Sequence, residues 1–390
     1  MSRLLVLEPF GGGSHASLYR GWSKYSRHEF TVLELPAVHW KWRSRHASLS
    51  LALQATELSE QGKCFDAVFC SDMLNLPEWR GFVCDELAFL PALTYFHENQ
   101  FTYPLAEGQT RDYHFAYNNI LSAISSEAIW FNSQFHLDEF RQAAVAWLRK
   151  MPDFNHADLL EAALADAIVL PPGIEPLRAR VSQHATSRNG TKDSSGSLRL
   201  GWVSRWEHDK RPDIFVKAVE QLLESGIDFE LILLGQQFAQ KPASLQHLLD
   251  IAESRVLHAG FAESKEEYWS WLGKMDFVIS TADHEFFGIG ICEAIAAGAR
   301  PVLPDRLAYP EVLELEDYPN RRCFFYEAAV ARSANGASTT ASNLVNCLLD
   351  QLMYQELHER PALNVTKFFW RNLARRYDEQ IEKLLSQASD

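Results

Sequence analysis

No run in the 390-residue chain approaches the roughly 20 consecutive apolar residues that a membrane-spanning helix needs. The opening MSRLLVLEPFGGG has only a short apolar stretch before its glycines, which indicates a first strand rather than a signal peptide. The six cysteines include no C-x-x-C pair, so a zinc site and a disulfide framework are both disfavoured. These absences predict a cytoplasmic protein with reduced thiols and no membrane partner.

Positive charge is also scarce. The chain has 37 Lys and Arg against 51 Asp and Glu, and its net charge is −14. This balance argues against a general nucleic-acid coat but leaves room for a local basic patch. The apolar fraction of 47% is that of a globular protein, and the length suffices for two domains.

Short apolar runs alternate with helix-like segments along the chain, which is typical of parallel sheets in doubly wound folds. In the first part we expect strands at 3–10, 30–37, 65–72, 92–98, 128–134 and 167–173. The pattern restarts after the polar segment 182–197, with strands expected at 198–205, 229–235, 255–261, 276–281 and 299–304. Helices are expected at 212–225 and 264–273, among others.

The chain is therefore predicted to divide into four parts. These are an N-terminal domain (1–173), a linker or flexible insertion (174–197), a second domain (198–363) and an amphipathic terminal helix (364–390). The predicted fold class is α/β, with two doubly wound Rossmann-like domains facing a cleft. The carboxyl ends of the strands of both domains would converge on that cleft.

In the second domain, GWVSRWEHDKRPD (201–213) follows a predicted strand and precedes a predicted helix. Arg205 and Lys210 lie in this loop, and a guanidinium with an ammonium suits the paired oxygens of a diphosphate. The alternative is a solvated basic turn, or cations that merely pair with Glu207 and Asp209.

The stretch STADHEFFGIGICEAIAAGARPVLP places Glu285 before a glycine-containing turn and Glu293 eight positions later. Gly288 and Gly290 allow backbone N–H groups to approach a ligand at the start of a helix, whose end Gly298 marks. Glu293 can accept hydrogen bonds from ribose hydroxyls, and Glu285 can hold a sugar beyond the diphosphate. The alternative is a strand, turn and helix with two exposed acids.

Three motifs stand out in the first domain. LEPFGGGSHASL places Gly12 and Gly13 in a turn that can face a phosphate or an acceptor. AVHWKWRSRHAS (37–48) is an aromatic and basic cluster, and YFHENQFTYP ends a predicted strand with His97, Glu98 and Asn99. A histidine at a strand end is more often structural than functional.

The second half resembles the donor-binding domain of retaining GT-B glycosyltransferases of the glycosyltransferase-4 type. This resemblance implies that an Arg and a Lys bind the donor diphosphate and that the two glutamates bind sugar and ribose. It also implies that the last helix packs back on the first domain and that HAGF (258–261) lines a base pocket. The matching donor residues are Arg205, Lys210, Gly288, Ile289, Gly290 and Glu293, with Glu285 at the sugar.

Five phrases resemble one narrower family, the tRNA-queuosine α-mannosyltransferases: GGSH, W-x-W-R, YFHENQ-x-x-YP, FNS-x-F and RWEHDK, between residue 3 and about residue 310. The resemblance implies transfer of mannose from GDP-mannose, with retention, to queuosine in the anticodon of tRNA(Asp). Since the protein itself supplies cations, neither a metal nor another cofactor is expected.

These considerations give the expected site residues. We expect His97 and Glu285 to be catalytic, with Gly12 and Gly13 joining the donor residues already named. The expected acceptor-binding residues are His15, Trp40, Trp42, Arg43, Arg45 and Asn99. Candidate phosphate contacts also include Lys41, Arg371, Arg375 and Arg376, unless these are scattered solvated charges.

Three other functions remain open at this stage. A GT-B enzyme with a lipid or glycan acceptor would carry a membrane-docking helix, for which 37–46 looks too short and broken. A nucleotide-sugar epimerase would not explain RWEHDK together with the two spaced glutamates. A non-catalytic tRNA-binding module would have no affinity for a nucleotide sugar.

Overall fold

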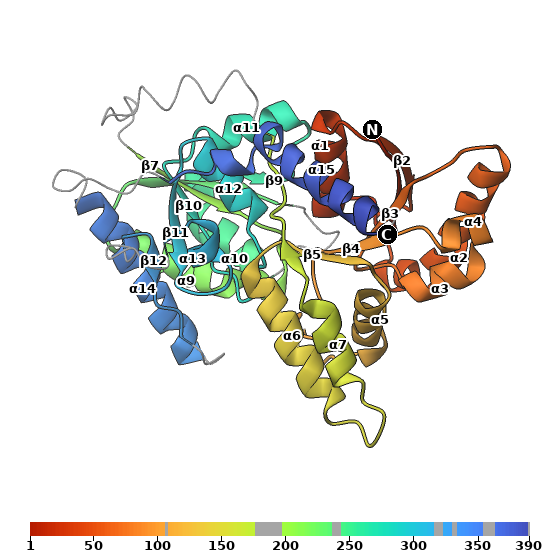
Figure 1. Ribbon diagram of the computed structural model, residues 1–390. Helices are drawn as coiled ribbons and strands as arrows, with labels where there is room; N and C mark the ends of the chain where they lie inside the picture. Colours follow the sequence, from red (N-terminus) through yellow and green to blue (C-terminus); the bar gives the residue numbers. More distant parts are fainter. Residues whose placement is uncertain are drawn as a thin grey trace. The chain divides into compact units, whose positions relative to one another are not determined.

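The computed structural model describes residues 1–105, 108–175, 197–235, 243–315, 323–329, 334–353 and 363–388. It has two compact units, shown in Figure 1: Met1–Gly173 with Lys367–Asp390, and Ile174–Thr366. We call them the first and the second unit. The expected boundaries were 173 and 363, and most of the expected linker (174–197) lies outside the described residues.

The first unit is built on a parallel six-stranded sheet with the order β2-β1-β3-β4-β5-β6. Its strands are β1 (Arg3–Glu8), β2 (Glu29–Glu34), β3 (Ala67–Ser71), β4 (Ala92–Phe96), β5 (Ala128–Phe131) and β6 (Ile168–Val169). The strand order reverses between β1 and β3, where Val6 pairs with Val32 on one side and with Phe69 on the other. Ligands of open parallel sheets bind beyond the strand ends at such a reversal.

Helices cover both faces of this sheet. They are α1 (Gly13–Tyr25), α2 (Trp40–Glu60), α3 (Leu76–Phe82), α4 (Asp85–Ala88), α5 (Tyr113–Ile124), α6 (Gln134–Leu148), α7 (Ala157–Leu164) and α15 (Trp370–Gln387). Side chains of β1 alternate between the two faces: Leu4 and Val6 join the core with α1 and α15, whereas Leu5 and Leu7 join the core with α2. The sheet is therefore buried on both sides, which explains its nearly continuous apolar strands.

The terminal helix α15 belongs to the first unit and lies beside α1 (Figure 1). A Cβ atom added to Gly21 or Gly173 would come within 2.0 Å or 2.3 Å of the Trp370 ring, so both positions require glycine. Asp378 accepts a hydrogen bond from the Trp22 indole (2.8 Å). The C-terminal segment thus completes the core of the N-terminal part.

The second unit contains a parallel sheet with the order β12-β11-β10-β7-β8-β9. Its strands are β7 (Leu198–Val203), β8 (Phe229–Leu234), β9 (Val256–Gly260), β10 (Phe277–Ile279), β11 (Arg300–Pro304) and β12 (Phe325–Tyr326). Its helices are α9 (Pro212–Glu224), α10 (Ala243–Ala252), α11 (Lys265–Leu272), α12 (Ile289–Ala296), α13 (Tyr309–Val312) and α14 (Ala334–Met353). Here the strand order reverses between β7 and β10.

The prediction of two doubly wound α/β domains is confirmed, and each expected strand is present near its expected position. The segment 37–46, which looked too short and broken for a membrane-docking helix, is continuous from Trp40 onward with the 21-residue helix α2. The strand β12 was not expected. Within the described part of the chain, no helix has both the length and the apolar character needed to cross a membrane.

Candidate active site

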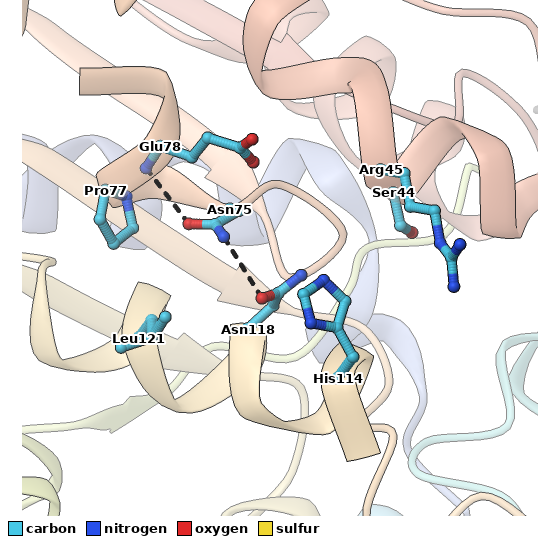
Figure 2. Close-up of a pocket in the computed structure, with 8 residues that line it drawn as sticks. All are labelled: Ser44, Arg45, Asn75, Pro77, Glu78, His114, Asn118 and Leu121. Atoms are coloured by element: carbon cyan, nitrogen blue, oxygen red, sulfur yellow. Dashed lines mark hydrogen bonds between the residues drawn. The ribbon is translucent and has the colours of Figure 1, made fainter. Parts of the chain in front are cut away.

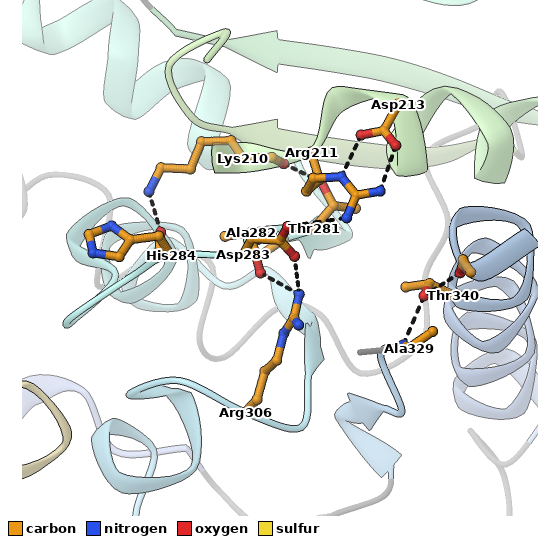
Figure 3. A network of polar contacts seen from close by, with 12 residues as sticks. Lys210, Arg211, Asp213, Thr281, Ala282, Asp283, His284, Arg306, Ala329 and Thr340 are labelled. Carbon is orange, nitrogen blue, oxygen red and sulfur yellow. Dashed lines mark hydrogen bonds and ion pairs between the residues drawn. The ribbon is translucent and has the colours of Figure 1, made fainter. Parts of the chain in front are cut away.

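Two loops of the second unit meet where β7 and β10 end, at the reversal of strand order (Figure 3). Thr281 donates a hydrogen bond from its hydroxyl to the carbonyl oxygen of Lys210 (2.7 Å). The backbone N–H of Asp283 donates to the carbonyl oxygen of Asp209 (2.8 Å). Residues predicted to bind the donor in separate motifs are thereby brought together.

Lys210 is the central cation of this cluster and is only 8% exposed. Its ammonium donates to the carbonyl oxygen of His284 (2.6 Å) and lies 3.0 Å from Asp209 Oδ2 and 3.3 Å from Glu285 Oε2. Burial disfavours the charged form, but Glu285 and Asp209 outweigh it, so the pKa of Lys210 is raised. Lys210 therefore stays protonated at neutral pH.

Glu285 holds the turn that precedes α12. Its Oε1 accepts a hydrogen bond from the backbone N–H of Gly288 (3.1 Å), while its Oε2 faces Lys210. Burial opposes ionisation of this carboxyl, but the charges of Lys210 and His284 and the hydrogen bonds from Lys210 and the Phe287 backbone together outweigh burial, so the pKa of Glu285 is lowered. Glu285 thus orients the turn at the start of α12.

The two glycines of this turn, Gly288 and Gly290, are needed for different structural reasons. Gly288 has a φ of +88°, which favours glycine, and an added Cβ would lie 2.9 Å from Tyr309. At Gly290 an added Cβ would lie 2.9 Å from Val203 Cγ1. Gly290 is thus explained by the packing of α12 on β7, without a ligand, and Ile289 is the first residue of α12.

Glu293 projects from α12 toward α11 and is half-buried. Its Oε2 accepts a hydrogen bond from the Tyr268 hydroxyl (2.7 Å). Burial raises the pKa of Glu293 to about 7 although the Tyr268 bond opposes the shift. Because this carboxyl titrates near neutral pH, its capacity to accept hydrogen bonds from hydroxyl groups of a ligand changes with pH in that range.

Arg205 lies at the exposed edge of the cluster, with its side chain 45% exposed and 3.3 Å from Glu207. Both predicted diphosphate-binding cations are therefore paired with acids, the alternative that the sequence left open. Phe261, at the end of β9, is 71% exposed and offers a flat face in the segment expected to line a base pocket.

Sequence reasoning missed Asp283 and its two arginine partners (Figure 3). Its carboxylate lies 3.1 Å from Arg211 Nη1 and 2.5 Å from Arg306 Nη2. Arg306 also donates to the carbonyl oxygen of Ala282 (3.1 Å). This network fixes the loop that carries Glu285, and the sequence showed only that Asp283 is an acid in the loop after a predicted strand.

The first unit contains a second polar cluster at the ends of β1, β3 and β4. Glu8, 1% exposed, accepts hydrogen bonds from the backbone N–H of Phe10 (2.8 Å) and the hydroxyl of Ser71 (3.1 Å). Both its oxygens lie 3.2 Å from His15 Nδ1. His15 stacks on His97 with ring centroids 4.0 Å apart. Two predicted site histidines are thus in direct contact.

These two histidines differ in protonation. Burial lowers the pKa of His15, but the charge and hydrogen bond of Glu8, together with the charges of Asp72 and Glu98, outweigh burial and raise the pKa to about 9. Burial and the neighbouring His15 together hold the pKa of His97 well below its usual range. At neutral pH the stack therefore pairs an imidazolium with a neutral imidazole, and the neutral ring has a buried Nε2 with no hydrogen-bond partner among the described residues.

Asp72 completes the cluster and was also missed. Its Oδ1 accepts a hydrogen bond from the backbone N–H of His97 (2.9 Å), and burial raises its pKa to about 7. Like Glu8, it is a buried acid at the end of a parallel strand. That position was the available signal, because acids are rarely buried without a reason.

Asn99 and the glycine turn have local structural explanations. Asn99 is fully buried, and its Oδ1 accepts hydrogen bonds from the backbone N–H groups of Phe101 and Thr102 (3.0 Å each). At Gly12 an added Cβ would lie 2.4 Å from the Cβ of Ala37, while Gly13 has a φ of +54°. The predicted ligand contacts of these residues remain predictions.

The predicted acceptor segment forms the first turns of α2. Trp40 is 38% and Trp42 60% exposed, so Trp42 does not fill the core. Arg43 Nε donates to the carbonyl oxygen of Pro36 (3.1 Å), and Arg45 pairs with Asp112 (3.3 Å). These side chains present flat rings and cations to solvent.

Two different protein families match this chain, one in each of the two units. A family model described as tRNA-queuosine alpha-mannosyltransferase N-terminal matches residues 3–174, and one described as Glycosyl transferases group 1 matches residues 197–336. The second match extends past residue 310, where the sequence resemblance was expected to end.

Solved structures of low sequence identity share the fold. The catalytic domain of starch synthase IV from Arabidopsis thaliana is 12% identical, covers 99% of each chain and gives a TM-score of 0.65. Sucrose-phosphate synthase from Thermosynechococcus elongatus is 13% identical, covers 99% of each chain and gives a TM-score of 0.63. Together with the family match of the second unit, this fold defines the protein as a GT-B glycosyltransferase.

A more similar relative narrows this class. The tRNA-queuosine alpha-mannosyltransferase of Drosophila melanogaster is 34% identical over 322 residues, which are 81% of this chain and 83% of the relative. The chain therefore belongs to the tRNA-queuosine alpha-mannosyltransferase family.

Proposed function

We propose that this glycosyltransferase transfers mannose from GDP-mannose to queuosine in the anticodon of tRNA(Asp), with retention of configuration. The observation that carries the proposal is the match to the Drosophila relative over 81% of the chain, which includes parts of both units. The polar clusters at both strand-order reversals support it, because each lies where an open parallel sheet binds its ligand.

The donor is assigned to the second unit. Arg205 and Lys210 neutralise the diphosphate, helped by the backbone N–H groups at the start of α12. Glu293 accepts hydrogen bonds from the ribose, and Glu285 from the sugar. When the diphosphate leaves, these preorganised cations stabilise its charge, so the proposal requires no metal.

The acceptor is assigned to the first unit. His15 is already protonated near neutral pH, since its pKa is about 9, and it therefore acts as a hydrogen-bond donor rather than as a base. A phosphate oxygen of the donor takes the proton of the attacking hydroxyl, on the face from which the diphosphate departs. His97, neutral and with its Nε2 available, orients the sugar hydroxyls.

A reducing compartment suits this chain, and the proposal places the enzyme in the cytoplasm with its tRNA substrate. Cys64 and Cys84 carry free thiols at exposed and half-buried positions, and Cys70 carries one in the core. In an oxidising compartment such accessible thiols would be prone to form disulfides.

A mass measurement tests the function. The protein is incubated with queuosine-modified tRNA and either GDP-mannose or UDP-glucose, and the nucleosides are analysed by mass spectrometry. We expect queuosine to gain one hexose with GDP-mannose alone, and tRNA without queuosine to gain none. Addition from UDP-glucose would contradict the donor assignment, and an unchanged queuosine with both donors would contradict the function.

A further inference from the structure

A hollow of about 390 Å³ lies in the first unit between the N-terminal half of α2, the start of α3 and helix α5 (Figure 2). We call it the α2–α5 pocket. Its lining residues are Ser44 and Arg45 from α2, Asn75, Pro77 and Glu78 at the start of α3, and His114, Asn118 and Leu121 from α5. These helices follow β2, β3 and β4, so they begin at the sheet edge that also carries Glu8 and His97.

The pocket contains polar groups that have no hydrogen-bond partner among the described residues. Ser44 is only 7% exposed, lines the pocket, and has a hydroxyl without a hydrogen-bond partner in the described part of the chain. Asn118 Oδ1 accepts from Asn75 Nδ2 (3.2 Å), and this bond fixes the side-chain amide of Asn118. The hydroxyl of Ser44 is therefore open to a polar ligand or to water in the pocket.

The pocket is lined by one cation, Arg45, and one acid, Glu78, and His114 is exposed at its rim. The N-termini of α2 and α5, the positive ends of their dipoles, lie near these residues. Asp112 pairs with Arg45 (3.3 Å) and also accepts from the backbone N–H of His114 (3.0 Å). Because the Arg45 ion pair is exposed, Arg45 can exchange Asp112 for a phosphate at little cost.

An exposed aromatic ring lies on α2 close to the residues that line the pocket: Trp42, 60% exposed, precedes Ser44 by two residues. The Trp40 ring lies 5.2 Å from Phe115 of α5, which shows that the two helices are side by side. Exposed rings next to cations are the usual platform for the bases of single-stranded RNA.

We propose that the α2–α5 pocket binds a nucleotide that flanks queuosine in the anticodon loop. Its phosphate lies at Arg45 and His114, its ribose or base edge at Ser44 and Asn118, and a neighbouring base stacks on Trp42. This inference rests on the proposed function and adds to it the surface that distinguishes an RNA acceptor from a free nucleoside. It also explains how a chain of net charge −14 binds RNA, since the contact is local.

Binding of a queuosine-containing anticodon stem-loop RNA tests the proposal by fluorescence anisotropy. The variants Arg45→Ala and His114→Ala should each weaken RNA binding several-fold, and the double variant by about tenfold or more. The affinity for GDP-mannose should stay that of the wild type. Both side chains are exposed, so folding should be unaffected, and thermal melting checks this.

A matched control is available in the same unit. Arg149 pairs with Glu161 (2.9 Å) with side-chain exposures of 60% and 44%, close to the 53% and 45% of Arg45 and Asp112. Arg149→Ala should leave RNA binding unchanged. Ser44→Val, which places methyl groups in the pocket floor, should weaken RNA binding without changing charge.

The possible outcomes distinguish a failure of the pocket proposal from a failure of the proposed function. If the wild type mannosylates tRNA and the pocket variants bind RNA normally, the pocket proposal is overturned while the function stands. An equal loss in Arg149→Ala would show a general effect of charge and would also overturn it. If the wild type neither binds the stem-loop nor modifies tRNA, the pocket proposal and the proposed function fail together.

Discussion

Glu293 gives the sharpest test of the donor site, because its carboxyl titrates near neutral pH. Burial raises its pKa to about 7 in the ligand-free protein. Ribose hydroxyls that donate to the carboxylate favour its ionised form, so binding should lower this pKa. The ionised fraction is about one tenth at pH 6 and about nine tenths at pH 8, so GDP-mannose affinity should rise about tenfold between them.

The variant Glu293→Gln should change affinity and stability in opposite directions. A glutamine stays neutral, so the rise in affinity with pH should disappear and affinity at pH 8 should fall by about tenfold. The raised pKa means that the ligand-free wild type loses stability as pH rises from the unfolded value through about 7. Glutamine removes this loss and should stabilise the ligand-free protein at pH 8 by about 1–3 kcal/mol.

Calorimetric titration at pH 6 and pH 8, with thermal unfolding of the ligand-free protein, measures both effects. GDP-mannose is the ligand of choice because the terminal phosphate of GDP itself titrates at about pH 6. The control is Glu266→Gln, an exposed acid of α11. If Glu293→Gln keeps the pH dependence of the wild type, or binds the donor as tightly at pH 8, Glu293 does not contact the ribose.

Three further predictions concern the other assigned residues. Arg205→Ala and Lys210→Ala should each weaken GDP-mannose binding by about 1.5–3 kcal/mol in calorimetry; wild-type affinity in both would show that the diphosphate lies elsewhere. EDTA should leave turnover unchanged; because the ligand atoms of Glu8, His15 and His97 lie within 4.8 Å of one another, a loss that Zn²⁺ restores would instead indicate a metal there. The double variant Arg43→Ala/Arg45→Ala should weaken tRNA binding and reduce its salt dependence while donor affinity is unchanged, and an unaltered salt slope would remove both side chains from the phosphate contacts.

The fold was largely predictable because a sheet buried on both faces leaves a strong pattern in the sequence. The start of α2 was not predictable from the sequence, because of the residues that this helix buries. This helix buries Ser44, Ala47 and Ser48 in its first half, so small residues replace the apolar stripe that identifies most helices. A sequence pattern cannot distinguish such a helix from a polar loop.

The candidate site was predictable only in part. Spacing relative to a strand end identified Glu285 and Glu293, and the structure brings Glu285 next to Lys210. Glu8 was missed because an acid at a strand end also reads as the beginning of a loop. Its importance depends on burial and on its contact with His15, which arise only when distant strands are adjacent.

The central claim is that α-mannose is transferred to queuosine in tRNA. The most direct measurement is glycosidase digestion of the nucleoside formed from queuosine-modified tRNA and GDP-mannose, followed by mass spectrometry. We expect a hexosylated queuosine from which α-mannosidase, but not β-mannosidase, restores queuosine, and no such product with Lys210→Ala. A product cleaved by β-mannosidase would contradict retention, and queuosine left unmodified by excess wild-type protein would contradict mannosyl transfer to queuosine by this enzyme.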